Sequence, residues 1–474
     1  MLKKLNRETT GIKQTYPVKV LQFGDGNFMR GFMDWIIDIL NEKTAFSGAV
    51  QIIRPLRRSN IEKKCEQDGL YHVIQKGLLN GNTISETRLV TCVAGAINPY
   101  TDFEQFLKTS ENPDLQFIIS NSTEAGIVFD SKDKSTDSLP ESFPGKVTLL
   151  LYHRFNFFKK NGTKGLILIP CELIEKNGDK LKETILQYAS HWNLPDDFKQ
   201  WTIDANTFCN TLVDRIVPGF PKDSVHEIQK SIGYEDNLMV MSEPFYLLVI
   251  EAPDRVKQIF PTEQARLNVK FVDNITPYRL RKVRILNGAH TALVPIAYLR
   301  GIRTVRDSVN DPYVGEFISK AIEEEIIPTL DLPEEELKDF ANDVIERFQN
   351  PFIKHELISI ALNSISKFKV RVLPSIIEYQ KRTGRLPVRL LQSLAALIVF
   401  YRGKWHDEPI PLNDSPEILD FFNKSWSSGT TEEVVQKVLS NISLWDCDLT
   451  QIDGLQELVT TFVNTLVTPE INSF

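Results

Sequence analysis

"VLQFGDGNFMRGFMDWIIDILNEK", residues 20–43, joins an apolar run to a helical pattern through a short turn that contains two glycines. The run Val18–Phe23 predicts a buried strand. Apolar residues then recur at every fourth position from Phe28 to Leu40, which predicts one face of a helix. The stretch is therefore either the start of a dinucleotide-binding unit or an ordinary strand-to-helix connection.

The spacing of Gly24 and Gly26 matches the first two glycines of the G-x-G-x-x-G fingerprint. The first allows a tight turn, and the second lets backbone amides approach a pyrophosphate. Met29 stands at the third position, where it cannot allow close helix–strand packing, and Arg30 follows with a forked guanidinium that can contact phosphate. A bare G-x-G leaves cofactor binding and a structural turn about equally open.

The ends of two later strands add polar candidates for the cofactor site. A second strand closes on Arg54, where an acidic residue normally holds the ribose of NAD, and Arg57 and Arg58 follow. These arginines either favour the 2′-phosphate of NADP or are surface charges without a ligand. In "IISNSTEAGI", residues 118–127, Asn121, Thr123 and Glu124 follow a strand and suit a nicotinamide or ribose, although a capped helix start fits as well.

Alternating strand and helix patterns in the first half predict an α/β Rossmann-type domain with a mostly parallel sheet. Helical periods dominate after the polar loop "FVDNITP", so we expect residues 1–272 to form this domain and residues 273–474 an all-helical one. The further strand candidates are Arg88–Ile97, Leu115–Asn121 and Lys164–Leu173.

Composition argues against several classes of protein, although local basic patches remain possible. The 474 residues are 42% hydrophobic and carry a net charge of -7, which argues against a nucleic-acid or anionic-membrane surface. Five scattered cysteines without a CxxC pair argue against a disulfide framework or a zinc site. We expect a cytoplasmic monomer or small homo-oligomer with a small-molecule substrate, no nucleic-acid or membrane partner and no metal.

The stretch "TPYRLRKVRILNGAHTALVP", residues 276–295, carries the candidate catalytic residues. At about 100° per residue, Lys282, Asn287 and His290 share one broad face of an α-helix, with Lys282 and Asn287 about 140° apart. Gly288 costs about 1 kcal/mol inside a helix, and a closely approaching substrate would explain it. The structural alternatives are a solvated lysine and a histidine that only satisfies a local hydrogen bond.

Such a set suits carbonyl reduction. Hydride addition to a carbonyl carbon generates an alkoxide, to which Lys282 can donate a proton and from which it can take one back in the reverse direction. The Asn287 amide can stabilise the developing oxyanion, and His290 can fix substrate hydroxyls or steer the lysine.

These two motifs together resemble the polyol-specific long-chain dehydrogenases, the family that includes mannitol dehydrogenases. Its G-x-G-x-F-x-R opening is matched by Gly24, Gly26, Phe28 and Arg30, with Asn27 between them, and its K-x4-N-x2-H signature by "KVRILNGAH". The similarity extends along nearly the whole chain, most closely toward a hexuronate-specific branch. The resemblance implies NADH-dependent reduction of D-tagaturonate to D-altronate. It also implies NAD as the cofactor, whereas Arg54, Arg57 and Arg58 mildly favour NADP.

One departure from mannitol-type relatives is Leu173, which stands in "CEL" where their second oxyanion asparagine stands and argues against mannitol as substrate. Fructuronate/mannonate or a neutral polyol remains an alternative substrate, and a non-catalytic dinucleotide sensor a remote alternative function.

A sugar acid needs a cation for its carboxylate, and "NPFIKHELISIALNSISKFKVRVLP" offers His355, Lys367 and Arg371. His355 and Lys367 would lie roughly 18 Å apart along a straight helix, so both contact one carboxylate only if the helix breaks between them. Lys367 and Arg371 share a face. The alternative is that both are solvated.

Overall fold

The computed structural model describes residues 2–54, 66–122, 126–406 and 408–468. The chain divides into two compact units, unit 1 (Met1–Lys76 and Thr83–Ile275) and unit 2 (Gly77–Asn82 and Thr276–Phe474). The predicted fold class is confirmed, because unit 1 contains a parallel α/β sheet and unit 2 is helix-rich.

The central sheet of unit 1 has the strand order β6-β3-β2-β7-β8-β9, and its strands pair in parallel. The chain runs outward from β2 to one edge and then returns to build the other half from β7. The carboxyl ends of β2 and β7 are therefore the switch point where dinucleotides bind in this topology. The strands are β2 (Val18–Phe23), β3 (Ala49–Ile53), β6 (Val93–Ile97), β7 (Phe117–Ser120), β8 (Ile167–Pro170) and β9 (Thr207–Phe208).

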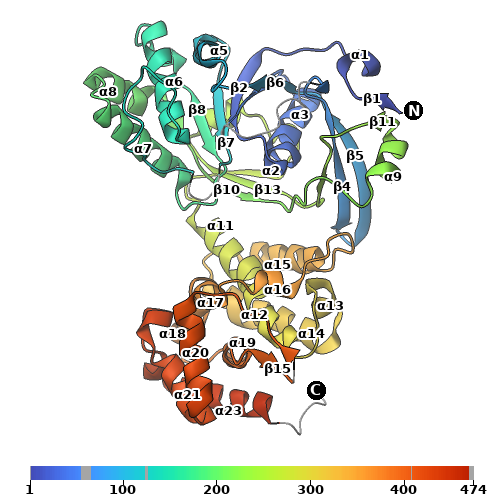
Figure 1. Cartoon of the computed structure of the whole chain (residues 1–474), viewed down its shortest axis with the longest axis vertical. Coiled ribbons are helices and arrows are strands. Elements are labelled where there is room, and N and C mark those ends of the chain that lie inside the picture. Colours follow the sequence, from blue (N-terminus) through green and yellow to red (C-terminus); the bar gives the residue numbers. More distant parts are fainter. Residues whose placement is uncertain (1, 55–65, 123–125, 407, 469–474) are drawn as a thin grey trace. The chain divides into compact units, whose positions relative to one another are not determined.

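Alternate side chains of these strands enter two separate cores. Leu21, Ile118 and Leu168 pack against one group of helices, while Val20 and Ile119 pack against α3 on the opposite face. Figure 1 shows α6, α7 and α8 on one side of the sheet and α3 on the other. These helices are α3 (Met33–Lys43), α5 (Phe103–Lys108), α6 (Phe143–Phe157), α7 (Asn177–His191) and α8 (Asp196–Ala205).

The helix expected from Phe28 to Leu40 is interrupted at Phe32, whose φ and ψ are -131° and -76°. It forms a short helix α2 (Asn27–Gly31) followed by α3. The buried Arg215 guanidinium donates to the Gly31 carbonyl at 2.7 Å, which withdraws that carbonyl from a continuous helical ladder.

The strand expected over Arg88–Ile97 is two strands in different sheets, β5 (Asn82–Val90) and β6. Thr91 turns the chain between them, since its amide and hydroxyl donate to Asp38 on α3 at 2.7 and 3.0 Å. The expectation of one strand was therefore wrong, because a tertiary contact breaks the apolar run.

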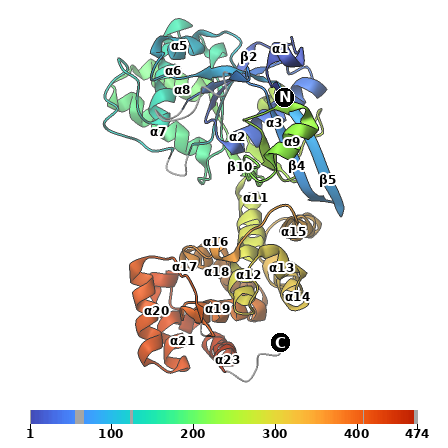
Figure 2. The same ribbon diagram turned by 45° about the vertical axis from the view of Figure 1, so that its right-hand side comes forward.

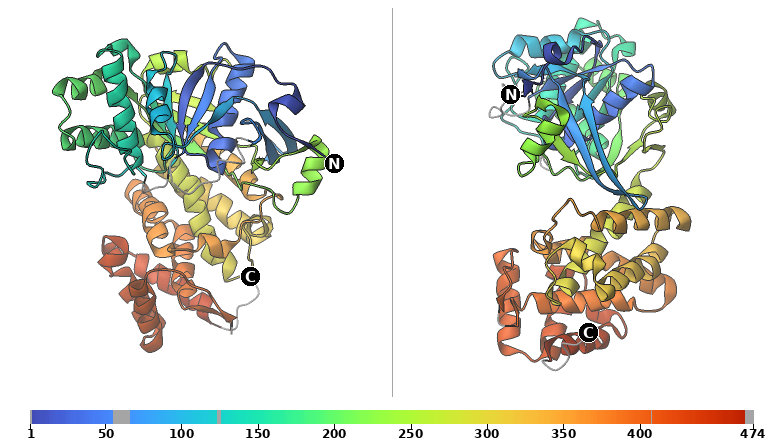
Figure 3. Two further views of the ribbon diagram at one scale, coloured as in Figure 1. Left: turned by 45° about the horizontal axis from the view of Figure 1, so that its top comes forward. Right: turned by 90° about the vertical axis from the view of Figure 1, so that its right-hand side faces the viewer.

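In the described part of unit 1, three smaller sheets accompany the central one. Figure 3 (right) shows β4 and β5 as two long strands side by side. The elements are β1 (Lys3–Lys4) with β11 (Tyr234–Glu235), β4 (Tyr71–Leu79) with β5 and β12 (Val240–Ser242), and β10 (Asn210–Asp214) with β13 (Leu247–Glu251) and β14 (Val269–Val272), together with helices α1 (Arg7–Thr10), α9 (Val225–Ile232) and α10 (Asp254–Ile259).

Unit 2 is built around α12 (Gly288–Tyr298), which packs against helices from along the whole unit. Figure 2 shows α13 and α14 on one side of α12 and α17 on the other. The remaining regular elements surround this centre. They are α11 (Thr276–Arg281), the π-helices η3 (Lys282–Asn287) and η4 (Ala321–Ile326), α13 (Val305–Asn310), α14 (Pro312–Lys320), α15 (Glu334–Phe348), α16 (Leu357–Ile360), α17 (Ser364–Arg371), α18 (Leu373–Thr383), α19 (Val388–Phe400), the hairpin β15 (Lys404–Trp405) with β16 (Glu408–Pro409), α20 (Pro416–Ser428), α21 (Thr431–Leu439), α22 (Ile442–Trp445) and α23 (Leu455–Val467).

Within the ranges that the structure describes, none of the helices has the length and apolar content needed to cross a bilayer.

Candidate active site

The turn after β2 is shaped by Gly24, whose φ of +122° lies where side chains are strained. A Cβ at this position would lie 2.8 Å from the Asn121 carbonyl oxygen, so the turn also needs glycine for its close approach to the end of β7. Gln22, fully buried on β2, donates to the Gly24 carbonyl at 3.1 Å and holds the turn. Sequence reasoning missed Gln22, although a polar residue inside an apolar strand was the available signal.

Gly26 begins α2 and faces open space, because no atom lies within 4 Å of the position that its Cβ would take. The first backbone amides of a helix point toward this space. A pyrophosphate accepts hydrogen bonds from such amides, and a side chain at position 26 would fill the approach. The glycine turn therefore fits the phosphate portion of a dinucleotide.

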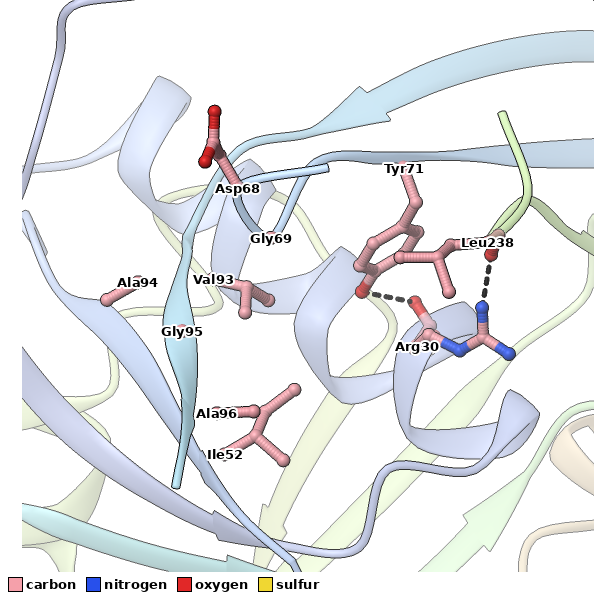
Figure 4. A pocket seen from close by; sticks show the side chains of 10 residues that line it. All are labelled: Arg30, Ile52, Asp68, Gly69, Tyr71, Val93, Ala94, Gly95, Ala96 and Leu238. Carbon is pink, nitrogen blue, oxygen red and sulfur yellow. Dashed lines mark hydrogen bonds between the residues drawn. The ribbon is translucent and has the colours of Figure 1, made fainter. Parts of the chain in front are cut away.

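Arg30 turns back onto the protein. Its guanidinium donates to the Leu238 carbonyl and, at 2.7 Å, to Asn27 Oδ1. Burial lowers the pKa of Arg30, and the nearby Tyr71 and Asp34 oppose that shift. Arg30 and Tyr71 line a pocket of about 230 Å³ that is also lined by residues of β3 and β6. Figure 4 shows these two side chains at one side of the pocket. Arg30 thus links α2 to the segment around Leu238 and orients Asn27, which is exposed beside the turn.

Phe28 stacks on Phe32 with ring centroids 4.9 Å apart and packs against the core under α3. Arg54 lies at the carboxyl end of β3, where its amide donates to the Ile97 carbonyl at 2.9 Å and its side chain is buried. Arg57 and Arg58 lie outside the described residues. The three residues Phe28, Asn27 and Arg54 are all near the edge at which a dinucleotide would lie, but Phe28 is mainly a packing residue.

At the end of β7, the Asn121 side chain donates to the Cys171 carbonyl at 2.8 Å and ties β7 to β8. Thr123 and Glu124, which we also expected to contact the cofactor, lie outside the described residues. A residue that sequence reasoning missed is Glu172, a buried carboxylate beside Asn121. It stands two residues after the end of the apolar strand β8, and that position was the available signal.

In unit 2, Lys282, Asn287 and His290 lie on consecutive helices, but the helix type differs from the expectation. Lys282–Asn287 is a π-helix and not an α-helix. Its i→i+5 hydrogen bonds wind the chain by a smaller angle per residue than an α-helix does, which brings residues five apart nearer to one face. Lys282 and Asn287 therefore lie closer together around the helix axis than the expected 140°, and all three side chains are partly exposed.

His290 is held between two rings. Its imidazole stacks on Phe348 with centroids 4.0 Å apart and meets the His355 ring edge-on at 5.2 Å. Burial lowers the pKa of His355 and so favours the neutral form of this ring. The candidate substrate residue His355 thus lies beside the candidate catalytic residue His290.

His355 precedes α16 and lies in no helix, whereas Lys367 and Arg371 lie on α17. Asn363, with φ of +51°, separates α16 from α17, so the straight-helix separation of His355 and Lys367 does not apply. Lys367 donates to the Ile360 carbonyl at 2.8 Å. Its pKa is lowered by burial and by the neighbouring Arg371, and Asp414 opposes the shift.

Arg371 lies against α12, where its guanidinium is 3.5 Å from Thr291 Oγ1. Burial also lowers the pKa of Arg371. A Cβ on Gly288 would lie 3.1 Å from the Arg371 carbonyl oxygen. The close approach of α17 to α12 therefore gives Gly288 a structural reason of its own, and a substrate is not needed to explain it. Lys367 and Arg371 together place two partly desolvated cations near α12.

Two family models cover most of the chain. The model of the mannitol dehydrogenase Rossmann domain matches residues 18–263, and that of the mannitol dehydrogenase C-terminal domain matches residues 274–467. The chain is 48% identical to the altronate oxidoreductase of Bacillus subtilis (strain 168), over 98% of this chain and 95% of the relative. It is 46% identical to the altronate oxidoreductase of Escherichia coli (strain SMS-3-5 / SECEC), over 97% and 96%.

Two solved structures show the same fold. One is mannitol 2-dehydrogenase of Pseudomonas fluorescens in a ternary complex with NAD and D-mannitol, at a TM-score of 0.68 and 19% identity over 98% of this chain and 96% of that chain. The other is D-sorbitol dehydrogenase in substrate-free form, at a TM-score of 0.80 and 21% identity over 98% and 97%.

Proposed function

This chain belongs to the mannitol dehydrogenase family, and we propose that it catalyses the reversible reduction of D-tagaturonate to D-altronate with NADH. The observation that carries the proposal is the extent of its likeness to altronate oxidoreductases, nearly half of all residues over almost the whole chain. The chemistry of the residues in each unit supports it independently.

Unit 1 supplies the residues for NAD. The open space before Gly26 fits a pyrophosphate, and Gly24, held by Gln22, keeps the turn against β7. Arg30 holds Asn27 beside that space, and Arg54 borders the adenosine side at the end of β3. When bound, NADH supplies the hydride that reduces the keto group.

Unit 2 supplies the proton and the hydrogen bonds. Lys282 Nζ donates a proton to the substrate oxygen as it gains negative charge, and accepts one in the oxidation direction. Asn287, five residues along the π-helix, donates an amide hydrogen bond to the same oxygen. His290, fixed by Phe348 and His355, orients substrate hydroxyls beside them.

Lys367 and Arg371 form the proposed carboxylate anchor of the substrate. Burial lowers the pKa of each side chain, because removal from water disfavours the charged form. A carboxylate would restore favourable interactions to both cations. A neutral polyol would leave both without that partner, which favours a sugar acid as substrate.

The cytoplasm is the proposed location, because NADH is supplied there and the buried Cys92, Cys171 and Cys209 are free thiols. Among the described residues, no cluster of three potential metal-ligating side chains is found.

The test is a spectrophotometric assay of NADH oxidation with D-tagaturonate, D-fructuronate and D-fructose. We expect the highest catalytic efficiency with tagaturonate and little turnover of fructose. A preference for fructuronate would reassign the substrate within the sugar acids. A preference for fructose would contradict both the proposed substrate and the carboxylate anchor.

A further inference from the structure

Glu172 is a buried carboxylate at the carboxyl end of β8, with a relative exposure of 2%. It accepts three hydrogen bonds from the neighbouring end of β7. One oxygen accepts from the Ser122 amide and the Ser122 hydroxyl, each at 2.9 Å, and the other accepts from the Ser120 hydroxyl at 3.0 Å. A single side chain therefore holds both serines that flank Asn121.

The backbone of Glu172 is itself held in place. Asn177 at the start of α7 donates to the carbonyls of Glu172 and Pro170 at 3.1 and 2.9 Å. Its own Oδ1 accepts from the Thr211 amide at 2.8 Å. The backbone of Glu172 is thus tied to α7 and β10 through Asn177, while its carboxylate is bonded to Ser120 and Ser122.

The held segment lies at the switch point of the sheet. The Asn121 carbonyl oxygen is the atom that a Cβ on Gly24 would meet at 2.8 Å, so residues 120–122 pack directly against the glycine turn. In a doubly wound sheet the second strand of the first half serves the adenosine ribose. The half that begins with β7 therefore serves the nicotinamide end of the dinucleotide.

We propose that Glu172 is a positioning residue that holds residues 120–122 in the conformation required by the nicotinamide half of the cofactor. This inference rests on the proposed use of NAD. It assigns Glu172 no contact with the cofactor, and it predicts that the adenosine half binds independently of it.

The chemistry of the three donors predicts which substitutions are tolerated. An alanine leaves the Ser122 amide, which can only donate, without its acceptor. A glutamine can turn its oxygen to the Ser122 amide while its NH₂ donates to the Ser120 hydroxyl, because a hydroxyl can also accept. Glu172→Gln should therefore retain the segment, and Glu172→Ala should release it.

The test compares two ligands by isothermal titration calorimetry: NADH, and ADP-ribose, which lacks the nicotinamide. In Glu172→Ala, we expect the Kd for NADH to rise at least about tenfold and that for ADP-ribose to change by less than about twofold. Glu172→Gln should bind both like the wild type. An equal loss of both ligands, or an unchanged Kd for NADH, would overturn the inference.

A control variant in unit 2 tests whether the effect is specific to Glu172. Glu325 is a buried carboxylate in unit 2 that accepts from the amides of Arg389 and Leu390 at 3.0 and 2.9 Å. Glu325→Ala removes a comparable group and should leave the ratio of the two Kd values unchanged. A changed ratio in this control would overturn the assignment to Glu172.

If Glu172→Ala does not fold, Ser122→Ala removes one of the three hydrogen bonds and keeps the carboxylate. It should weaken NADH selectively by about threefold, and an equal effect on ADP-ribose would overturn the inference. If the wild-type protein binds NADH but does not oxidise it with tagaturonate, the proposed substrate is contradicted. The comparison of NADH with ADP-ribose would still test the proposed role of Glu172.

Discussion

The glycine turn of unit 1 and the π-helix of unit 2 carry the two halves of the proposed chemistry, and they differ in what determines their shape. At the turn, backbone conformation alone requires glycine at position 24, where φ is +122°. At Lys282–Asn287, no residue type demands a π-helix. A local requirement of the backbone is therefore visible in the sequence, whereas a helical register set by packing is not.

The packing around the π-helix explains why the register is hidden. Immediately after it, Gly288 approaches the Arg371 carbonyl of α17, and Arg281, immediately before it, pairs with Glu336 of α15 at 2.8 Å. The helix is thus fixed on both sides by elements more than 50 residues away in sequence. One extra residue per turn between these contacts places Lys282 and Asn287 together, as π-helical turns at functional sites often do.

The largest expected effect is on the π-helix. Lys282→Ala should lower turnover of tagaturonate by about 10²–10⁴-fold, because general acid catalysis typically contributes this much. NADH affinity should remain unchanged, since the glycine turn is in unit 1. Steady-state kinetics and an NADH titration on one preparation check both parts. Turnover close to that of the wild type would remove Lys282 from the mechanism.

The matching disruption of the glycine turn is Gly26→Val. A side chain there would enter the space in front of α2, so we expect NADH to bind about 100-fold more weakly, which is about 2.7 kcal/mol. Gly162→Val is the matched control, because Gly162 in the same unit also has open space at its Cβ position. Fluorescence titration that finds equal affinity in the two variants would make the turn purely structural.

A smaller effect is expected at the proposed anchor beside the π-helix. Lys367→Met should raise the KM for tagaturonate about tenfold, since Arg371 remains to hold the carboxylate. Lys369→Met is the control on the same helix, where Lys369 pairs with the exposed Asp446 at 3.0 Å. Steady-state kinetics should find the KM for a neutral ketose unaffected by either change. An equal rise for tagaturonate and the ketose in Lys367→Met would show that Lys367 is not the anchor.

The smallest expected effect concerns stability next to the π-helix. Burial raises the pKa of Asp343 on α15 to about 6; Arg347 and Arg281 oppose this shift, while Glu346 and Asp339 add to it. The folded state therefore retains a proton that the unfolded state releases near pH 4, and stability falls as the pH rises from about 4 to about 6.

Asp343→Asn removes this titration. At pH 7 we expect it to stabilise the protein by about 1 kcal/mol, allowing for the partial exposure of the carboxyl, and at pH 4 to have little effect. Urea unfolding at both pH values measures the difference. A variant that is less stable than the wild type at pH 7 would mean that the charged carboxylate is favourable in the folded protein.

The same contrast explains how much of the molecule could be predicted from its sequence. The strand Val18–Phe23 has the predicted bounds, because a short apolar run before glycines has few alternatives. The single strand predicted over Arg88–Ile97 failed because Asp38, far away in sequence, captures Thr91. Gly288 was recognised as unusual, yet the Arg371 carbonyl beside it is a tertiary contact that the sequence does not reveal.

The candidate site residues show the same difference between local signals, which the sequence reveals, and tertiary contacts, which it does not. Lys282, Asn287 and His290 were found by their spacing, but the ring contacts of His290 with Phe348 and His355 join segments that no spacing relates. Glu172 and Gln22 act by holding backbone carbonyls and amides, and only the folded chain reveals those partners.

The most direct test of the proposed substrate and cofactor is the reverse reaction of the wild-type protein. Purified enzyme is given NAD with D-altronate, D-mannonate or D-mannitol, and NADP with D-altronate, and catalytic efficiencies are compared. We expect NAD with D-altronate to be by far the most efficient pair. A higher efficiency with D-mannitol, or with NADP in place of NAD, would contradict it.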